Sequence, residues 1–196
     1  MIDDEYKKIL KQYHKLSDRH ILVAETDMSS SDIQKVVALC DRIRKAGNEL
    51  VGLIRKKYDQ LMRTKRYRKL LKLYGSTEDK KKRKIYANQL KEMQKAYNVT
   101  WDYCRKSMIT IGKKYGVDAV FALTKAEDVW RGTEKCLYGN GNTIHFSKYG
   151  ELPCIRAKQI NRGIPMSVKD GKLQFRLGKT AFGIQVNDRF QQDEVN

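Results

Sequence analysis

Glycine and proline are distributed unevenly along the chain, and this limits the folds that it can adopt. Residues 1–138 hold 6 of the 13 glycines and neither proline, whereas residues 139–196 hold 7 glycines and both prolines. Because Gly and Pro punctuate regular structure and favour turns, the first part is expected to be helical and the second to consist of short strands. The sequence therefore predicts an α+β chain: an N-terminal segment (1–30), a helical domain (31–138) and a small antiparallel β-barrel domain (139–196).

The first long helix is expected to begin at Ser31, with Gln34 completing a capping-box pattern. Apolar residues then recur at spacings of three, four and seven, which places them on one helical face. Gly47 lies on the same stripe and would permit a close crossing with another helix. This helix is expected to continue to about residue 73, either straight or with a bend.

Three further helices are expected over residues 78–97, 100–116 and 118–138. Gly116 is suited to end the second of them. Thr124 and Glu127 repeat the capping-box pattern inside the last one, so the sequence leaves open whether it is one helix or two.

Polar and apolar residues alternate after a turn signal at residues 139–142. Ile144 and Phe146 would lie on one face of a strand and His145 on the other. The clearest hairpin is residues 168–173, where Asp-Gly suits a tight turn. Residues 21–24 are expected to add one more strand. Later strands are expected at Leu173, Phe175 and Leu177, and at Phe182, Ile184 and Val186.

The formal net charge is +18, and residues 55–95 alone carry 16 basic and 4 acidic residues. Nucleic acid is the favoured partner, because Lys and Arg that neutralise phosphates release counterions; an anionic membrane and an inert charged surface are the alternatives. Most such contacts would bind phosphate and carry no sequence information. Tyr67 is open to core packing or to stacking on a base. The candidate contacts here are Arg55, Lys56, Arg63, Lys65, Arg66, Tyr67, Arg68, Lys69 and Lys72.

No catalytic residue, metal ligand or cofactor of this chain is predicted. The sequence holds no phosphate-binding loop, nucleophile elbow or dinucleotide fingerprint, and its four cysteines form no C-x-x-C pair. No apolar run is long enough to span a bilayer, and the acidic N-terminus is unlike a signal peptide. A cytoplasmic protein with reduced cysteines and no membrane partner is therefore expected.

The stretch Val129–Gly141, followed by Ile144–Gly150 and by Lys158–Ile164, resembles the amino-terminal half of transposon-encoded TnpB proteins and compact type V CRISPR effectors. In that family a helix ends at a Gly-Asn-Gly turn and leads into the strands of a wedge barrel. The resemblance implies that the helical domain is a recognition domain inserted into, or followed by, that barrel. It places four further candidate contacts in the wedge region: Lys148, Lys158, Asn161 and Arg162.

The same resemblance implies partners. The chain would hold a structured guide RNA and the target DNA, with base pairing reading the sequence and the protein reading shape and backbone. The family's nuclease acids lie further toward the carboxyl end, so Mg²⁺ would belong to a nuclease domain that this chain lacks. The chain is expected to be a fragment, a truncated gene product or half of a split effector with a separate RuvC-like chain. A regulator of duplex DNA is the alternative.

Overall fold

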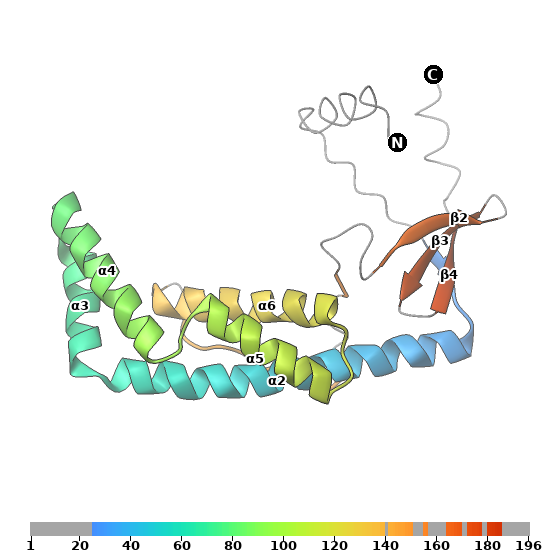
Figure 1. Cartoon of the computed structure of the whole chain (residues 1–196), viewed down its shortest axis with the longest axis horizontal. Helices are drawn as coiled ribbons and strands as arrows, with labels where there is room; N and C mark the ends of the chain where they lie inside the picture. The colour runs from blue at the N-terminus through green and yellow to red at the C-terminus, as the bar shows by residue number, and fades with distance from the viewer. Residues whose placement is uncertain are drawn as a thin grey trace, which may run out of the picture.

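The computed structural model describes residues 25–139, 141–150, 155–156, 164–169, 172–177 and 180–185. This part of the chain is mostly helical and carries a small antiparallel sheet (Figure 1). The elements, in chain order, are β1 (Glu25–Asp27), α2 (Ser30–Arg63), α3 (Lys65–Ser76), α4 (Lys80–Ala96), α5 (Trp101–Lys114), α6 (Ala119–Leu137), β2 (Met166–Lys169), β3 (Lys172–Leu177) and β4 (Thr180–Gln185). None of the helices in these ranges is long and apolar enough to cross a membrane.

Helices α2, α5 and α6 pack against one another, and we call them the helical layer (Figure 1). Their shared core is apolar, and its most buried members are Ala46, Leu50, Ile54, Cys104, Met108, Ala122 and Ala126. The side chain of Lys125, on α6, covers Gly47. A Cβ atom added at Gly47 would lie only 2.4 Å from the Lys125 Cε. The expectation that Gly47 permits a close approach is confirmed, and the group that approaches is a lysine stem.

Helices α3 and α4 form a helical hairpin that rises from one end of the layer (Figure 1). It packs on a second apolar cluster, the hairpin core, to which the ends of α2 and α6 contribute Leu61 and Leu137; the other buried members are Tyr67, Leu70, Leu90 and Val99. Of the two forms left open for the first long helix, the bent one is found: Thr64 has extended backbone (ψ 116°) and separates α2 from α3, which ends at Ser76. The Thr64 hydroxyl donates a hydrogen bond of 3.1 Å to the hydroxyl of Tyr97, the C-cap of α4. This contact joins the bend to the C-terminal end of α4.

Nearby polar side chains cap the helix ends, and some of the caps differ from the expected ones. The N-cap of α2 is Ser29, whose Oγ accepts from the Asp32 N–H, so the expected cap at Ser31 is wrong by two residues. Thr100 caps α5, in agreement with the expected start near residue 100, and Gly116 follows its end, as expected, with a left-handed φ of +63°. The possible break in the last helix is absent from α6, where the Thr124 hydroxyl donates to the Val120 carbonyl.

The sheet has the strand order β1-β4-β3-β2, with every described pair antiparallel. The predicted hairpin is confirmed, since Lys169 pairs with Lys172; its turn residues and the expected strand at 21–24 lie outside the described residues. The Phe175 and Phe182 rings stack with centroids 5.0 Å apart. Within the described ranges the sheet is open, with β1 and β2 at its edges, and no closed barrel is seen.

Residues 141–150 form no strand, contrary to the alternation pattern. Ile144 is buried in the core of the helical layer, whereas Phe146 is 47% exposed, so the two side chains do not share a face. The segment instead lies on α2, where the Asn48 side chain donates to the Ser147 carbonyl and accepts from the Ser147 N–H, both at 2.9 Å. We call residues 144–150 the strap.

Candidate nucleic-acid interface

Helix α3 separates its cations from its apolar residues. At 3.6 residues per turn, Lys65, Arg68 and Lys72 lie on one side of the helix, and Tyr67 and Leu70 lie on the opposite side. Tyr67 and Leu70 pack into the hairpin core, which turns the cations outward. The exposed cations at this end of α2 and along α3 are Arg63, Lys65, Arg66, Arg68, Lys69 and Lys72.

These six cations have no counter-ion within the described part of the chain. Helix α3 contains no Asp or Glu, and none of the described ion pairs includes a residue between 63 and 72. A shallow depression at the α2–α3 bend is lined by Asp59, Met62, Arg63 and Arg68, so one carboxylate lies nearby without forming an ion pair. The positive field of α3 is therefore left for a partner to neutralise.

Helix α4 adds positive charge at the tip of the hairpin. Residues 80–84 form the first turns of α4. Asp79 caps them by accepting from the N–H groups of Lys81 and Lys82. Five cations beside the positive end of a helix dipole repel it and one another. The Arg83 guanidinium lies 4.9 Å from the Tyr74 ring centroid, which connects the tip to α3.

Tyr67 supports this surface from below and does not belong to it. Its side chain is fully buried, and its hydroxyl accepts a hydrogen bond of 3.0 Å from the Gln94 amide on α4. Burial raises the pKa of the Tyr67 hydroxyl above its usual value. The choice between core packing and base stacking is therefore decided for the core, and the expected contact of Tyr67 with nucleic acid is wrong.

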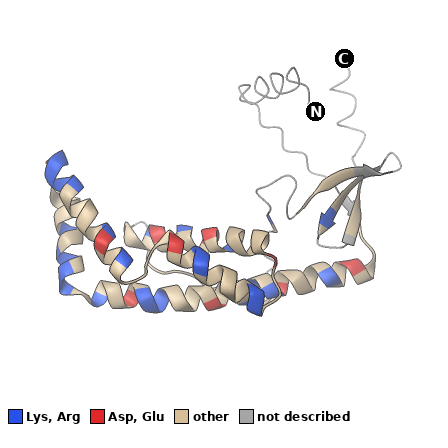
Figure 2. Ribbon diagram, viewed as in Figure 1, with Lys and Arg blue, Asp and Glu red and all other residues tan. Residues whose placement is uncertain are grey.

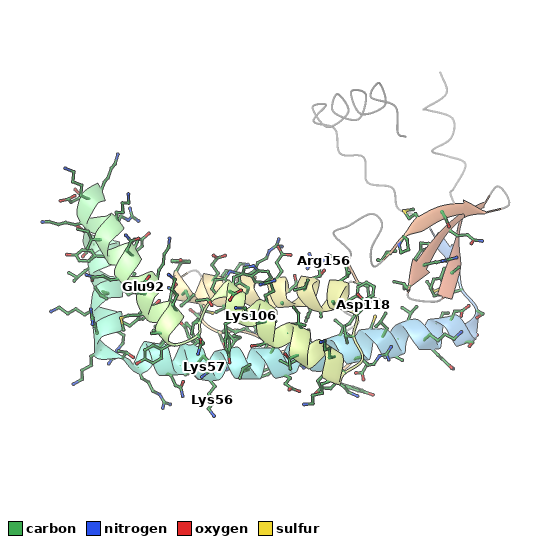
Figure 3. All side chains as sticks on the ribbon, in the orientation of Figure 1. Lys56, Lys57, Glu92, Lys106, Asp118 and Arg156 are labelled. Atoms are coloured by element: carbon green, nitrogen blue, oxygen red, sulfur yellow. The ribbon has the colours of Figure 1, made fainter. Side chains whose placement is uncertain are left out.

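The remaining candidates lie apart from the hairpin. Arg55, on α2, places its guanidinium 5.2 Å from the Phe146 ring centroid of the strap. Lys56 is exposed and points away from α5 and α6 (Figure 3). Lys148 is exposed on the strap. The other three candidates, Lys158, Asn161 and Arg162, lie outside the described residues.

Several cations of the helical layer, by contrast, form ion pairs, most of them with carboxylates of the same helix. Asp41 binds Arg44 and Lys45, and Asp102 binds Arg105 and Lys106. These neighbours hold the pKa of both carboxyl groups below its usual value. Lys35–Asp32 and Arg131–Glu127 are further pairs within one helix, whereas Lys114–Glu49 joins α5 to α2 and Arg156–Asp128 joins residue 156 to α6. Figure 2 shows the result: blue and red alternate over the layer, and blue dominates the hairpin.

Sequence reasoning did not select two parts of the surface. Lys80–Lys84 were not among the candidate contacts, although they form the first turns of α4, which packs against α3, and so belong to the same positive surface. Phe146 and Tyr149 were also not selected, because only the path of the strap along α2 places them under Arg55 and Arg44. No local pattern in the sequence reports that path.

Among the described residues, no group of three or more His, Cys, Asp and Glu side chains could hold a metal ion. The features of the described surface that stand out are its charge and its exposed aromatic rings. No protein-family model matches the chain, and neither a curated protein nor a solved structure matches it.

Proposed function

We propose that the chain binds nucleic acid through the helical hairpin, with α3 and the start of α4 contacting the phosphate backbone of structured RNA or of an RNA–DNA duplex. One observation carries the proposal: six cations at residues 63–72 are exposed, share a surface backed by a buried core, and have no carboxylate partner among the described residues. Exposed like charges repel one another, and a bound polyanion removes that repulsion. Binding is favoured further because the neutralised phosphates release their condensed counterions.

The resemblance to TnpB-like proteins supports a more specific version. In it the hairpin belongs to a recognition domain, and the sheet belongs to a wedge-like barrel domain. The ligands are a guide RNA and its heteroduplex with target DNA, in the cytoplasm. In such proteins cleavage and Mg²⁺ binding belong to a RuvC-like nuclease domain, and base pairing supplies the sequence specificity.

Two variants matched in charge test the hairpin. The hairpin variant replaces Arg66, Arg68, Lys69 and Lys72 with Ala, and all four side chains are exposed and unpaired among the described residues. The layer variant replaces Lys45, Arg105, Lys106 and Arg131 with Ala, and all four are exposed members of intrahelical ion pairs. Each variant removes four positive charges, so a difference between them reports position and not net charge.

Fluorescence anisotropy with labelled RNA duplex, RNA–DNA hybrid and DNA duplex gives the readout. We expect the hairpin variant to bind RNA duplex and hybrid at least about tenfold more weakly than the wild type, because it loses several phosphate contacts. The layer variant should bind nearly as well as the wild type. Equal weakening of both variants would contradict a localised interface. Tight, sequence-selective binding to ribonuclease-treated DNA duplex alone would favour the DNA regulator instead.

A further inference from the structure

The strap presents two aromatic rings to solvent, and each ring is held from one side by an arginine of α2. Tyr149 is 89% exposed and lies 5.4 Å from the Arg44 guanidinium, measured to the ring centroid. Phe146 lies 5.2 Å from the guanidinium of Arg55. A cation over one face of a ring leaves the other face open.

The strap is anchored at several points, so the rings are placed by the fold. Ile144 is buried in the layer core at one end. Both backbone groups of Ser147 are hydrogen-bonded by the Asn48 side chain, and the Ser147 hydroxyl accepts from the Lys125 ammonium at 3.2 Å. At 3.6 residues per turn, Arg44, Asn48 and Arg55 project from α2 within about 40° of one another. They therefore form one row on the side of α2 that faces the strap.

The separation of the rings suits a polymer better than a single small molecule. Phe146 and Tyr149 are three residues apart, so their Cα atoms lie at most about 10 Å apart. A stacked strand advances about 3.4 Å per nucleotide, so the two rings would serve bases within about three positions of one another along one strand. Aromatic rings stack on any base, because every base has a π face.

Beside Tyr149 lies a groove of about 470 Å³ along the start of α2. Its apolar wall includes Ile33, Val37 and Ala38, of which Ile33 and Val37 are 49% and 42% exposed. Gln34 and Asp41 supply polar groups at its edge. A planar heterocycle with a polar rim complements such a groove, since its face would lie on apolar carbon and its edge on hydrogen-bonding groups.

We infer that the strap is a second binding surface, on which unpaired bases of RNA stack against Phe146 and Tyr149 and one base enters the groove beside Tyr149. The inference rests on the proposed function, because the hairpin supplies the phosphate contacts that bring the RNA to the molecule. RNA is favoured as the occupant because its loops and bulges expose unstacked bases next to duplex. Arg55 adds a cation without a carboxylate partner among the described residues.

The test uses the full chain and two labelled RNAs: an oligouridine of about 12 nucleotides and a blunt duplex of about 16 base pairs. We expect Phe146→Ala and Tyr149→Ala each to weaken oligouridine binding about fivefold or more and to leave duplex binding unchanged. Phe146→Tyr and Tyr149→Phe keep the rings and should bind as the wild type does. Trp101→Ala is the matched control, because Trp101 is an exposed aromatic residue (38%) away from the strap.

A second readout separates stacking from a structural effect. A 2-aminopurine placed in the oligonucleotide should lose fluorescence on binding the wild type, and the quenching should disappear in the two Ala variants. The outcomes distinguish the two proposals. Loss of binding in the hairpin variant with no effect of the strap variants would overturn the strap and leave the hairpin standing. Duplex binding that the hairpin variant retains in full would overturn the proposed function. Equal or tighter binding of an oligothymidine DNA would overturn the assignment to RNA.

Discussion

The helical layer and the helical hairpin differ in how many of their cations form ion pairs with carboxylates. In the layer, carboxylates lie three or four residues from the cations that they bind, as with Asp41 and Lys45 or Asp102 and Lys106. In the hairpin, Lys95–Glu92 is the one ion pair among the described residues. The chain's charge of +18 is therefore expressed mainly at one end of the described structure (Figure 2).

The difference shows that the arrangement of ion pairs, and not net charge alone, determines where a basic protein has a positive surface field. Exposed intrahelical ion pairs contribute little to stability, but they cancel the local field that a polyanion would meet. A patch without such pairs repels itself, so it depends on a rigid support and on a partner. The hairpin has that support in its small core around Tyr67. The comparison implies that the hairpin is the less stable and the more functional of the two regions.

The largest effect should come from removing the support. We expect Tyr67→Ala to destabilise the hairpin by about 3–5 kcal/mol, because the ring is fully buried and leaves a cavity. Amide hydrogen exchange should then speed up in α3 and α4 and stay slow in α5 and α6. Uniform loss of protection over all five helices would show that the two regions unfold as one unit.

A smaller effect is expected from Tyr67→Phe, which keeps the ring and removes the hydroxyl. The Gln94 amide would lose its acceptor inside the hairpin core, at a cost of about 1–3 kcal/mol. Denaturant unfolding followed by circular dichroism measures the change. A variant as stable as the wild type would mean that another acceptor or water satisfies Gln94. Nucleic-acid affinity at low temperature should be retained, because no surface cation changes.

The smallest effect concerns an ion pair of the layer. Glu49 accepts hydrogen bonds from the Lys114 ammonium (2.7 Å) and the Tyr115 hydroxyl (2.8 Å), and the first of these contributes most to lowering the pKa of Glu49 below its ordinary value of 4.5. A carboxyl with a lowered folded-state pKa stabilises above its unfolded pKa, and this stabilisation is lost as pH falls through the folded value.

The wild type should therefore exceed Glu49→Gln in unfolding free energy by a small, constant amount near neutral pH. The gap should close as pH falls below about 4.5, the ordinary pKa of this carboxyl. Thermal melts of both proteins across the acid range provide the measurement. A gap that widens in acid would contradict the assigned direction of the pKa change.

Local patterns predicted the elements whose causes are local. Thr100 and Gly116 bound α5 through a side-chain cap and a left-handed residue. The turn near residue 170 was identified from its Asp-Gly dipeptide. The pairing of Asp41 with Lys45 and of Asp102 with Lys106 was also readable, because the spacing of four is in the sequence. A carboxylate four residues from a cation on the same helix therefore distinguishes, from the sequence alone, a cation that is neutralised from one that is not.

The features that sequence reasoning missed depend on residues far apart in the chain. A bend in the first long helix was left open, but its position at Thr64 was not predicted, and it goes with a contact to the hydroxyl of Tyr97, 33 residues away. The strap resembles a strand in its alternation, yet Asn48 holds it on α2 across 99 residues. The cap at Ser29 was missed for a different reason: Ser29, Ser30 and Ser31 offer the same chemistry, and Asp32 selects the first of them.

The salt dependence of binding tests the central claim most directly. For a labelled RNA–DNA duplex, the slope of log K against log salt should be shallower in the hairpin variant than in the wild type by roughly 0.7 to 0.9 per lost phosphate contact. The layer variant, with the same net charge as the hairpin variant, should keep the slope of the wild type. Equal slopes in the hairpin variant and the wild type would contradict the account, because α3 would then be a solvated face without a ligand.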